Sequence, residues 1–382
     1  MKKAIMYGAG NIGRGFIGQL FSQSGYEVAF IDVNMTVIDR LNADREYPVY
    51  ITAGDHYDIC PVKNVCGIDG KDVPAIAEAM AEADVMATAV GVNILKFIAA
   101  PFAAGVKRRM EKGIEAPLNV IICENMIGAD SYFAGLVKQN LDDAEKAYFD
   151  SHIALVEPSI GRMVPATPKE IAEKNPLAVC VEPYCELPVD KAAFRGEIPQ
   201  IKNMVPFAPF DFYIRRKLFM HNMSHALVAY LGYRKGYTYI WEAVADPDIR
   251  TDAIHALSES SCALSAEYGV PLKDLMSFSA ELIDRFGNRL LGDTVERVGK
   301  DTKRKLSEND RLVGAANLCL KHGLIPNFIS KGIAAALEFA PEGDASSEEV
   351  AAFAKEHGAA AALEKYGNVK PDSVIIRLVA GK

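Results

Sequence analysis

The chain has 382 residues, 50% of them hydrophobic, which is enough for two domains with full cores. Its net charge of −8 argues against nucleic acid or an anionic membrane as the main partner, although local basic residues can still hold a small anionic substrate. The seven cysteines are scattered, without a Cys-x2-Cys pair or a Cys/His cluster, so we expect no metal site and no disulfide framework. The first predicted strand begins almost at Met1 and no apolar run has membrane length, so we expect a cytoplasmic protein without a signal peptide.

A glycine-rich turn follows the first predicted strand. The turn is Gly8-Ala-Gly-Asn-Ile-Gly13, which has the spacing of a dinucleotide-binding fingerprint. We expect Gly8 to make the tight turn, Gly10 to let the backbone approach a pyrophosphate, and Gly13 to let helix pack on strand. The flanking elements are those that the fingerprint requires: a strand at Ala4–Tyr7, a helix at Phe16–Ser24 and a strand at Glu27–Asp32.

The choice of cofactor depends on Asp32, at the end of the second strand. A carboxylate there accepts hydrogen bonds from ribose hydroxyls and repels a 2′-phosphate, and neither Val33 nor Asn34 offsets that repulsion. We therefore expect NAD rather than NADP, with Asn11 and Ile12 at the helix start also contacting the cofactor. The alternative interpretation is that Asp32 is an ordinary turn residue.

Short apolar runs then alternate with helical stretches, which predicts a doubly wound, Rossmann-type α/β domain with a largely parallel sheet. The predicted strands are Asp84–Val90, Leu118–Cys123, Ile153–Val156 and Leu177–Val181, and two of the helices are Val73–Glu82 and Ser131–Asn140. Ligands of such sheets bind at the carboxyl ends of the strands. Val90 is therefore expected beside the cofactor, and Asn125 or Arg162 could face the substrate or the nicotinamide. Each of them could equally be a residue that orders its loop.

One predicted helix, residues 215–232, carries an amine, an amide and two imidazoles, and we expect it to end at Gly232. At about 100° per residue, these four side chains fall within an arc of about 140°: Lys217, His221, His225 and Asn222. The opposite side carries residues expected in the core: Met220, Met223 and Leu227. A Lys of lowered pKa can act as a general base, an Asn can donate to an oxyanion, and a His can hold or relay a proton. The alternative is a solvated helix face.

Near residue 200 the pattern changes. Prolines between 183 and 209 predict a linker between an NAD-binding domain, residues 1–200, and a mainly α-helical substrate and catalytic domain, residues 201–382. Amphipathic, Ala-rich helices are expected there at Asp248–Tyr268, Leu272–Phe286, Asp310–His322, Asn327–Phe339 and Ser346–Tyr366. Basic residues gather between 285 and 305. Most are explained as helix-surface charge, but one or two arginines could bind a phosphate or a carboxylate.

Four segments resemble the polyol-specific long-chain dehydrogenases, the mannitol dehydrogenase family. They are residues 8–18, Cys123-Glu-Asn125, Lys217–His225 and residues 297–312. The resemblance runs through nearly the whole chain. It implies a metal-independent oxidoreductase with a nucleotide-binding domain and a helical C-terminal domain.

The resemblance also implies roles for single residues. Lys217 would be the general base, Asn222 and Asn125 would hydrogen-bond the reacting oxygen, and His225 would hold a neighbouring hydroxyl or support the lysine. The reaction implied is NAD-dependent interconversion of D-mannitol 1-phosphate and D-fructose 6-phosphate, so the expected partner is a small sugar alcohol or sugar phosphate. The alternatives are the same chemistry on a free polyol or a hexuronate, or a non-catalytic NAD-sensing protein. The sequence does not predict an oligomeric state.

Several positions depart from the family pattern. Gly161 stands where the family usually has Asp, and Asn288-Arg289 stands where Asn-Pro is common. The catalytic helix reads Asn-Met-Ser-His instead of the Asn-Thr-Gly-His more frequent in phosphate-specific members, and His221 is an additional imidazole. These differences concern the substrate more than the reaction. They are either lineage drift or signs of a changed substrate.

Overall fold

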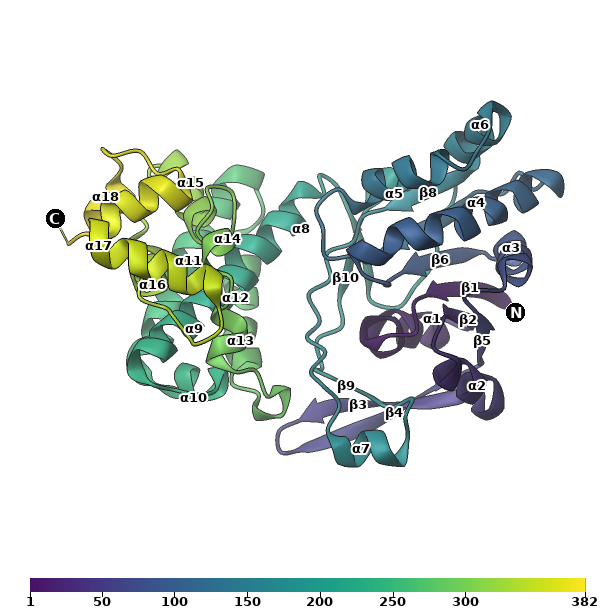
Figure 1. Cartoon of the computed structure of the whole chain (residues 1–382), viewed down its shortest axis with the longest axis horizontal. Coiled ribbons are helices and arrows are strands. Elements are labelled where there is room, and N and C mark those ends of the chain that lie inside the picture. Colours follow the sequence, from purple (N-terminus) through teal and green to yellow (C-terminus); the bar gives the residue numbers. More distant parts are fainter. Residues whose placement is uncertain (382) are drawn as a thin grey trace. The chain divides into compact units, whose positions relative to one another are not determined.

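Figure 1 shows the computed structural model, which describes residues 1–381. The chain forms two compact units, Met1–Phe210 and Asp211–Lys382. Among the described helices, none combines the length and the apolar character needed to cross a bilayer. The seven cysteines are all free thiols.

Six parallel strands form the central sheet of the first unit. They lie in the order β5-β2-β1-β6-β7-β8. Their bounds are β1 Lys2–Tyr7, β2 Tyr26–Asp32, β5 Val65–Asp69, β6 Val85–Thr88, β7 Leu118–Ile122 and β8 Ile153–Val156. Counted along the chain, this is the order 3-2-1-4-5-6 of a Rossmann sheet, so the predicted fold class is confirmed. The chain reverses direction across the sheet between β1 and β6, and their carboxyl ends border the crevice where such sheets bind ligands.

The sheet is buried on both faces, and successive side chains of a strand point to opposite faces, so each strand contributes to two apolar cores. In β1, Ala4 and Met6 belong to one apolar core and Ile5 and Tyr7 to the other. Figure 1 shows α3 and α4 on one side of the sheet and α1 and α2 on the other. The helices of this unit are α1 Gly18–Gln23, α2 Met35–Asp44, α3 Val73–Glu82, α4 Leu95–Glu111, α5 Ala129–Lys138, α6 Asp143–His152 and α7 Lys169–Lys174.

Two features of this unit differ from the sequence prediction. The strand expected at 177–181 is β9 Val179–Val181, and it pairs with β3 Glu46–Ala53 in a separate small sheet instead of joining the central one. The antiparallel partner of β3 is β4 His56–Lys63, and the sequence analysis predicted neither strand of this hairpin. A last pair of parallel strands, β10 Leu187–Asp190 and β11 Met204–Phe207, precedes the second unit.

The second unit is mainly helical, as predicted. Its helices are α8 Asp211–Arg216, α9 Met223–Lys235, α10 Ile240–Ala245, α11 Pro247–Tyr268, α12 Leu272–Phe286, α13 Val295–Gly299, α14 Thr302–Lys305, α15 Val313–Lys321, α16 Asn327–Ala336, α17 Ala345–Gly367 and α18 Val374–Val379. Helix α9 packs against α10, α11, α13 and α16. Its apolar residues are accordingly buried around most of its circumference. The three residues expected in the core are all buried: Met223 and Leu227 in α9, and Met220 in the turn just before it.

The predicted end of this helix was wrong. Helix α9 continues to Lys235 and is capped by Gly236, which adopts the left-handed conformation with φ 79°. Gly232 lies inside the helix, and a Cβ added there would approach the Cβ of Ala243 to 2.8 Å. Gly232 is therefore explained by the close packing of α10 against α9 and not by a helix terminus.

Candidate functional site

The helix that was expected to be regular is interrupted by a π-helical turn, η4 Lys217–Asn222, between α8 and α9. A π-helix forms i→i+5 hydrogen bonds and has more residues per turn than an α-helix, so residues five apart lie closer together around the axis. The wider turn therefore brings Lys217 and Asn222 toward the same face, whereas a regular α-helix would separate them by about 140°. A second π-helical turn, Gly13–Ile17, follows the glycine-rich loop. Since π-turns are frequent at functional sites, both positions fit the residues predicted from the sequence.

Lys217 lies in an environment that favours its neutral amine. Burial lowers its pKa from 10.5 to about 8, and the positive charge of Arg311 adds to this effect. Arg311 follows α14 and binds Asp310, with 2.7 Å between its Nε and the Asp310 Oδ1. A lysine with a pKa near neutrality can accept a proton at physiological pH.

The imidazole of His225 is held from two sides. Its Nε2 lies 3.4 Å from the Oδ2 of Asp293, and its ring stacks on Phe286 with a centroid distance of 4.7 Å and an angle of 7°. Burial raises the pKa of Asp293, but its hydrogen bond with His225 and the charges of His225 and Arg297 outweigh this and hold the pKa below its ordinary value. An ionised Asp293 orients the imidazole by accepting from its Nε2.

His221 is a buried imidazole beside this pair, with 6.0 Å between the His221 and His225 ring centroids. Burial, together with the charges of Arg285, His225, Lys217 and Arg311, lowers its pKa well below 6.5. The side chain is therefore neutral at pH 7.

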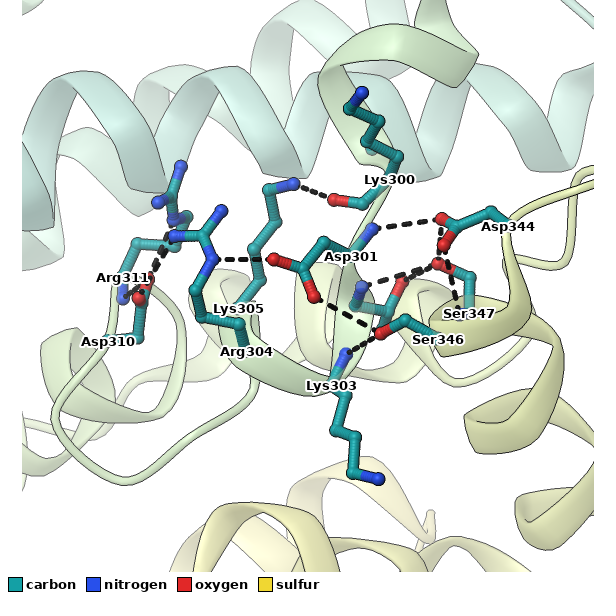
Figure 2. A network of polar contacts seen from close by, with 12 residues as sticks. Lys300, Asp301, Lys303, Arg304, Lys305, Asp310, Arg311, Asp344, Ser346 and Ser347 are labelled. Carbon is teal, nitrogen blue, oxygen red and sulfur yellow. Dashed lines mark hydrogen bonds and ion pairs between the residues drawn. The ribbon is translucent and has the colours of Figure 1, made fainter. Parts of the chain in front are cut away.

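A basic cluster follows along the chain, and we define it as Lys300, Lys303, Arg304, Lys305 and Arg311 (Figure 2). Figure 2 shows Arg304 and Arg311 both reaching toward Asp310, and Arg304 also binds Asp301. The buried Lys305 donates to the carbonyl oxygen of Lys300. Burial lowers the pKa of Lys305 from 10.5 to about 8, and the charges of Arg311 and Arg304 add to this effect.

The glycine-rich loop of the first unit is closely folded. Gly8 has φ 104°, and a Cβ there would lie 2.5 Å from the Ala89 carbonyl oxygen. A Cβ on Gly13 would lie 2.0 Å from the Gly8 oxygen, whereas one on Gly10 would meet nothing within 4 Å. The loop therefore tolerates only glycine at two positions and leaves open space beside the third, where a pyrophosphate would approach.

Asp32 connects this loop to the end of β2. Its carboxylate accepts hydrogen bonds from the backbone amides of Ala9, at 2.7 Å, and of Asn34, at 2.9 Å. Asn11 and Ile12 precede the π-turn; Asn11 is exposed and Ile12 partly buried. The structure thus brings the predicted cofactor residues around one end of β1 and β2.

Two further predicted residues lie at the carboxyl ends of the neighbouring strands. Val90 follows β6 and is partly buried, and Asn125 follows β7 and is exposed. The sequence analysis assigned no role to Glu124 between them. This buried carboxylate accepts hydrogen bonds from the Thr88 hydroxyl and the Val90 amide.

Arg162, once considered for substrate binding, is a structural residue. Its buried guanidinium donates to the carbonyl oxygens of Glu182 and Gly15 and to the side chain of Gln19. Beside it, a Cβ added to Gly161 would lie 3.2 Å from the ring of Tyr184, so the tyrosine occupies the space that a larger side chain would need. Of the two interpretations left open for Arg162, these contacts support the one in which it orders its loop, because its donors are used inside the unit.

The sequence analysis gave no individual role to Asp293, Phe286, Lys305 or Arg311. Arg311 was noticed only as part of a family segment, and Lys305 only as part of that segment and of the basic run between 285 and 305. No local pattern marks the contacts of Asp293 and Phe286. Arg289, noted as a departure from the family, lies over the Trp241 ring at 4.4 Å. Among the described residues, no group of three or more His, Cys, Asp or Glu side chains is placed to hold a metal ion.

Comparison with known families gives a match over both units. The model of the mannitol dehydrogenase Rossmann domain matches residues 2–203, and that of the mannitol dehydrogenase C-terminal domain matches residues 210–371. The chain belongs to the mannitol dehydrogenase family. This membership confirms the family resemblance that the sequence motifs indicated.

Two solved structures are similar to this member of the mannitol dehydrogenase family. A D-sorbitol dehydrogenase in substrate-free form is 16% identical, with a TM-score of 0.76 over 88% of this chain and 80% of that chain. The Pseudomonas fluorescens mannitol 2-dehydrogenase, in a ternary complex with NAD and D-mannitol, is 15% identical, with a TM-score of 0.72 over 100% of this chain and 90% of that chain. At these identities the similarity concerns the fold.

Proposed function

We propose that this chain is an NAD-dependent polyol dehydrogenase that interconverts D-mannitol 1-phosphate and D-fructose 6-phosphate. The observation that carries the proposal is the π-turn with Lys217 and Asn222, in which the lysine has a pKa of about 8. Family membership supports polyol oxidoreduction, and the π-turn supplies a base and a hydrogen-bond donor for it.

The proposed cofactor is NAD, and the residues of the first unit fit it. Gly10 faces open space beside the start of the π-turn, where backbone amides can meet a pyrophosphate. The Asp32 carboxylate can accept ribose hydroxyls and would repel the 2′-phosphate of NADP. When bound, NAD supplies a nicotinamide that accepts a hydride from the substrate. The assignment of cofactor binding to residues 1–200 and of substrate binding to residues 201–382 is part of this proposal.

In the proposed mechanism, Lys217 removes the proton from the substrate hydroxyl during oxidation. Its Nζ must be neutral for this step, and burial together with Arg311 provides that state. The Asn222 amide donates to the same oxygen as negative charge develops on it. His225, oriented by Asp293 and by stacking on Phe286, holds a neighbouring hydroxyl. Asn125 keeps its predicted role as a hydrogen-bond donor to the reacting oxygen.

The proposal of a phosphorylated substrate rests on the basic cluster. Lys305 is buried and its hydrogen bond goes to a carbonyl and not to a carboxylate. Burial, followed by the charges of Arg311 and Arg304, lowers its pKa. Arg311 lies close enough to lower the pKa of both Lys305 and Lys217. A dianionic phosphate beside Arg311 and Lys305 would relieve this excess of positive charge and would be held by charge-assisted hydrogen bonds.

The test is NADH oxidation with D-fructose 6-phosphate, D-fructose, fructuronate and tagaturonate at equal concentrations. The proposal predicts strong selectivity for fructose 6-phosphate. Lys305→Met should lower kcat/KM for this substrate by about 10- to 100-fold, the effect of losing a hydrogen bond between charged groups. Lys303→Met is the matched control, because Lys303 is exposed and already paired with Glu349. Selectivity for fructose or a hexuronate would move the proposal to that substrate, and no turnover on any of them would refute it.

A further inference from the structure

Glu124 joins two loops at the carboxyl edge of the central sheet. It comes two residues after β7 and is 8% exposed. Its Oε2 accepts a hydrogen bond of 2.6 Å from the Thr88 hydroxyl, and its Oε1 accepts one of 3.0 Å from the Val90 amide. The Gly91 amide also donates to this carboxylate. All three donors belong to the segment Thr88–Gly91, which comprises the last residue of β6 and the three residues after it.

That segment, Thr88–Gly91, borders the glycine-rich loop directly. The Ala89 amide donates to the Tyr7 carbonyl at the end of β1. The Ala89 carbonyl oxygen packs against Gly8, where a Cβ would lie only 2.5 Å from it. Gly91 has φ 91°, so the chain turns sharply there before the next helical residues. A displacement of this segment would therefore move both Val90 and the wall against which Gly8 packs.

The carboxylate is held at an energetic cost that its three donors offset in part. Burial raises the pKa of Glu124 above its ordinary value, and the hydrogen bonds from Thr88, Val90 and Gly91 counteract only part of that rise. A buried carboxylate is an acceptor only, which matches three converging donors. A glutamine amide of the same length would instead direct an NH2 group at one of these donors and leave it unsatisfied.

We propose that Glu124 is a positioning residue that sets the Thr88–Gly91 segment against the glycine-rich loop and thereby sets the affinity for the dinucleotide. The same side chain fixes the backbone immediately before Asn125. The inference rests on the proposed use of NAD. It assigns to Glu124 an effect on cofactor binding without contact with the substrate.

The experiment is a fluorescence titration of the full-length chain with NADH, followed by a double-mutant cycle. Glu124→Gln should raise the Kd for NADH by about 10-fold or more, and Thr88→Val by several-fold, since each removes a charge-assisted hydrogen bond. Both changes break the same contact, so their effects on the Kd for NADH should not be additive. Adding Thr88→Val to Glu124→Gln should raise the Kd by a smaller factor than Thr88→Val does in the unmodified chain. Thr88→Ser retains the hydroxyl and should restore the Kd of the unmodified chain.

Glu259→Gln is the matched control. Glu259 is a largely buried carboxylate in the second unit that accepts hydrogen bonds from the amides of Phe328 and Ile329. It should lower the melting temperature without changing the Kd for NADH.

An unchanged Kd in Glu124→Gln, or fully additive effects with Thr88→Val, would overturn the positioning role while leaving the proposed function intact. Failure of the unmodified chain to bind NADH would refute both. If Glu124→Gln does not fold, the comparison of Thr88→Val with Thr88→Ser decides, because the hydroxyl contact predicts different Kd values for the two.

Discussion

Replacing Arg311 with Gln is expected to raise the pKa of Lys217 and to move the pH dependence of polyol oxidation toward alkaline pH. Two causes lower this pKa from 10.5 to about 8: burial is the larger and the charge of Arg311 the smaller. The substitution removes the second cause only. The apparent pKa should therefore rise by less than half of the interval back to 10.5.

The size of the effect follows from the fraction of neutral lysine. With a pKa of about 8, roughly a quarter of Lys217 is neutral at about pH 7.5, against about 0.1% for an unperturbed lysine. The site therefore maintains about 200-fold more base at that pH. Oxidation needs the neutral amine, so its rate should rise with pH through about 8. Reduction needs the protonated amine as an acid, so its rate should fall as pH rises through the same value.

The assay is kcat/KM measured in both directions from about pH 6 to about pH 10. Arg311→Lys serves as the control, because it retains the positive charge and should leave the position of the limb nearly unchanged. Arg311 is also proposed to bind the substrate phosphate, so the position of the pH limb is diagnostic and the absolute rate is not. The reasoning would be refuted if the pH profile of kcat/KM showed the same apparent pKa in Arg311→Gln as in the unmodified chain. It would also be refuted if the profile of the unmodified chain showed no change near pH 8.

Four further substitutions test the two sites. Asp32→Ala should reduce the preference for NAD over NADP, measured as the ratio of kcat/KM values, and an unchanged ratio would mean that Asp32 does not face the ribose. Gly10→Ala should weaken NADH binding without changing the melting temperature, because an added Cβ meets open space in the protein but occupies the path of the pyrophosphate. Gly13→Ala should lower the stability by about 1–3 kcal/mol as well, since its Cβ would collide with the Gly8 oxygen; equal melting temperatures of the two variants would contradict this. Asp293→Asn should lower kcat about 10-fold, because it weakens the contact that orients His225. A kcat equal to that of the unmodified enzyme would show that Asp293 has no such role.

The features that the sequence predicted well depend on patterns among residues that are close together in the chain. The fingerprint at Gly8–Gly13 and the strand that ends at Asp32 follow one another in one continuous stretch of the chain. Their meaning depends on a spacing that the chain displays directly. The helices of the second unit were similarly accessible, because the 3.6-residue period of their apolar residues is a local property. The central sheet followed from the alternation of short apolar runs with helices.

The features that were missed depend on pairing between distant parts of the chain. The strand Val179–Val181 has the composition of a central strand, but its partner β3 belongs to a separate sheet, and a short apolar run does not specify its partner. Arg162 follows a strand and resembles a ligand-binding residue until its buried contacts with Gly15 and Gln19 are seen. Asp293 and Arg311 act on the catalytic helix from other elements, and no spacing within the helix indicates them.

The π-turn was missed for a different reason. A change from i→i+4 to i→i+5 hydrogen bonding leaves no mark in composition, and the pattern from 215 to 232 fits a regular helix. The wheel drawn at about 100° per residue therefore placed Asn222 at the edge of the polar arc. The observed π-helical turn places Asn222 closer to the side of the helix that carries Lys217 than the α-helical wheel does, so the predicted local geometry was wrong.

The most direct test of the account is Lys217→Ala, measured for turnover and for NADH binding in the same preparation. The account predicts that kcat for fructose 6-phosphate reduction falls by several orders of magnitude, because the variant lacks the group that transfers the proton. The Kd for NADH should stay unchanged, since the predicted cofactor residues all belong to the first unit. Turnover that survives this substitution would contradict the assignment of Lys217 as the base and with it the proposed mechanism.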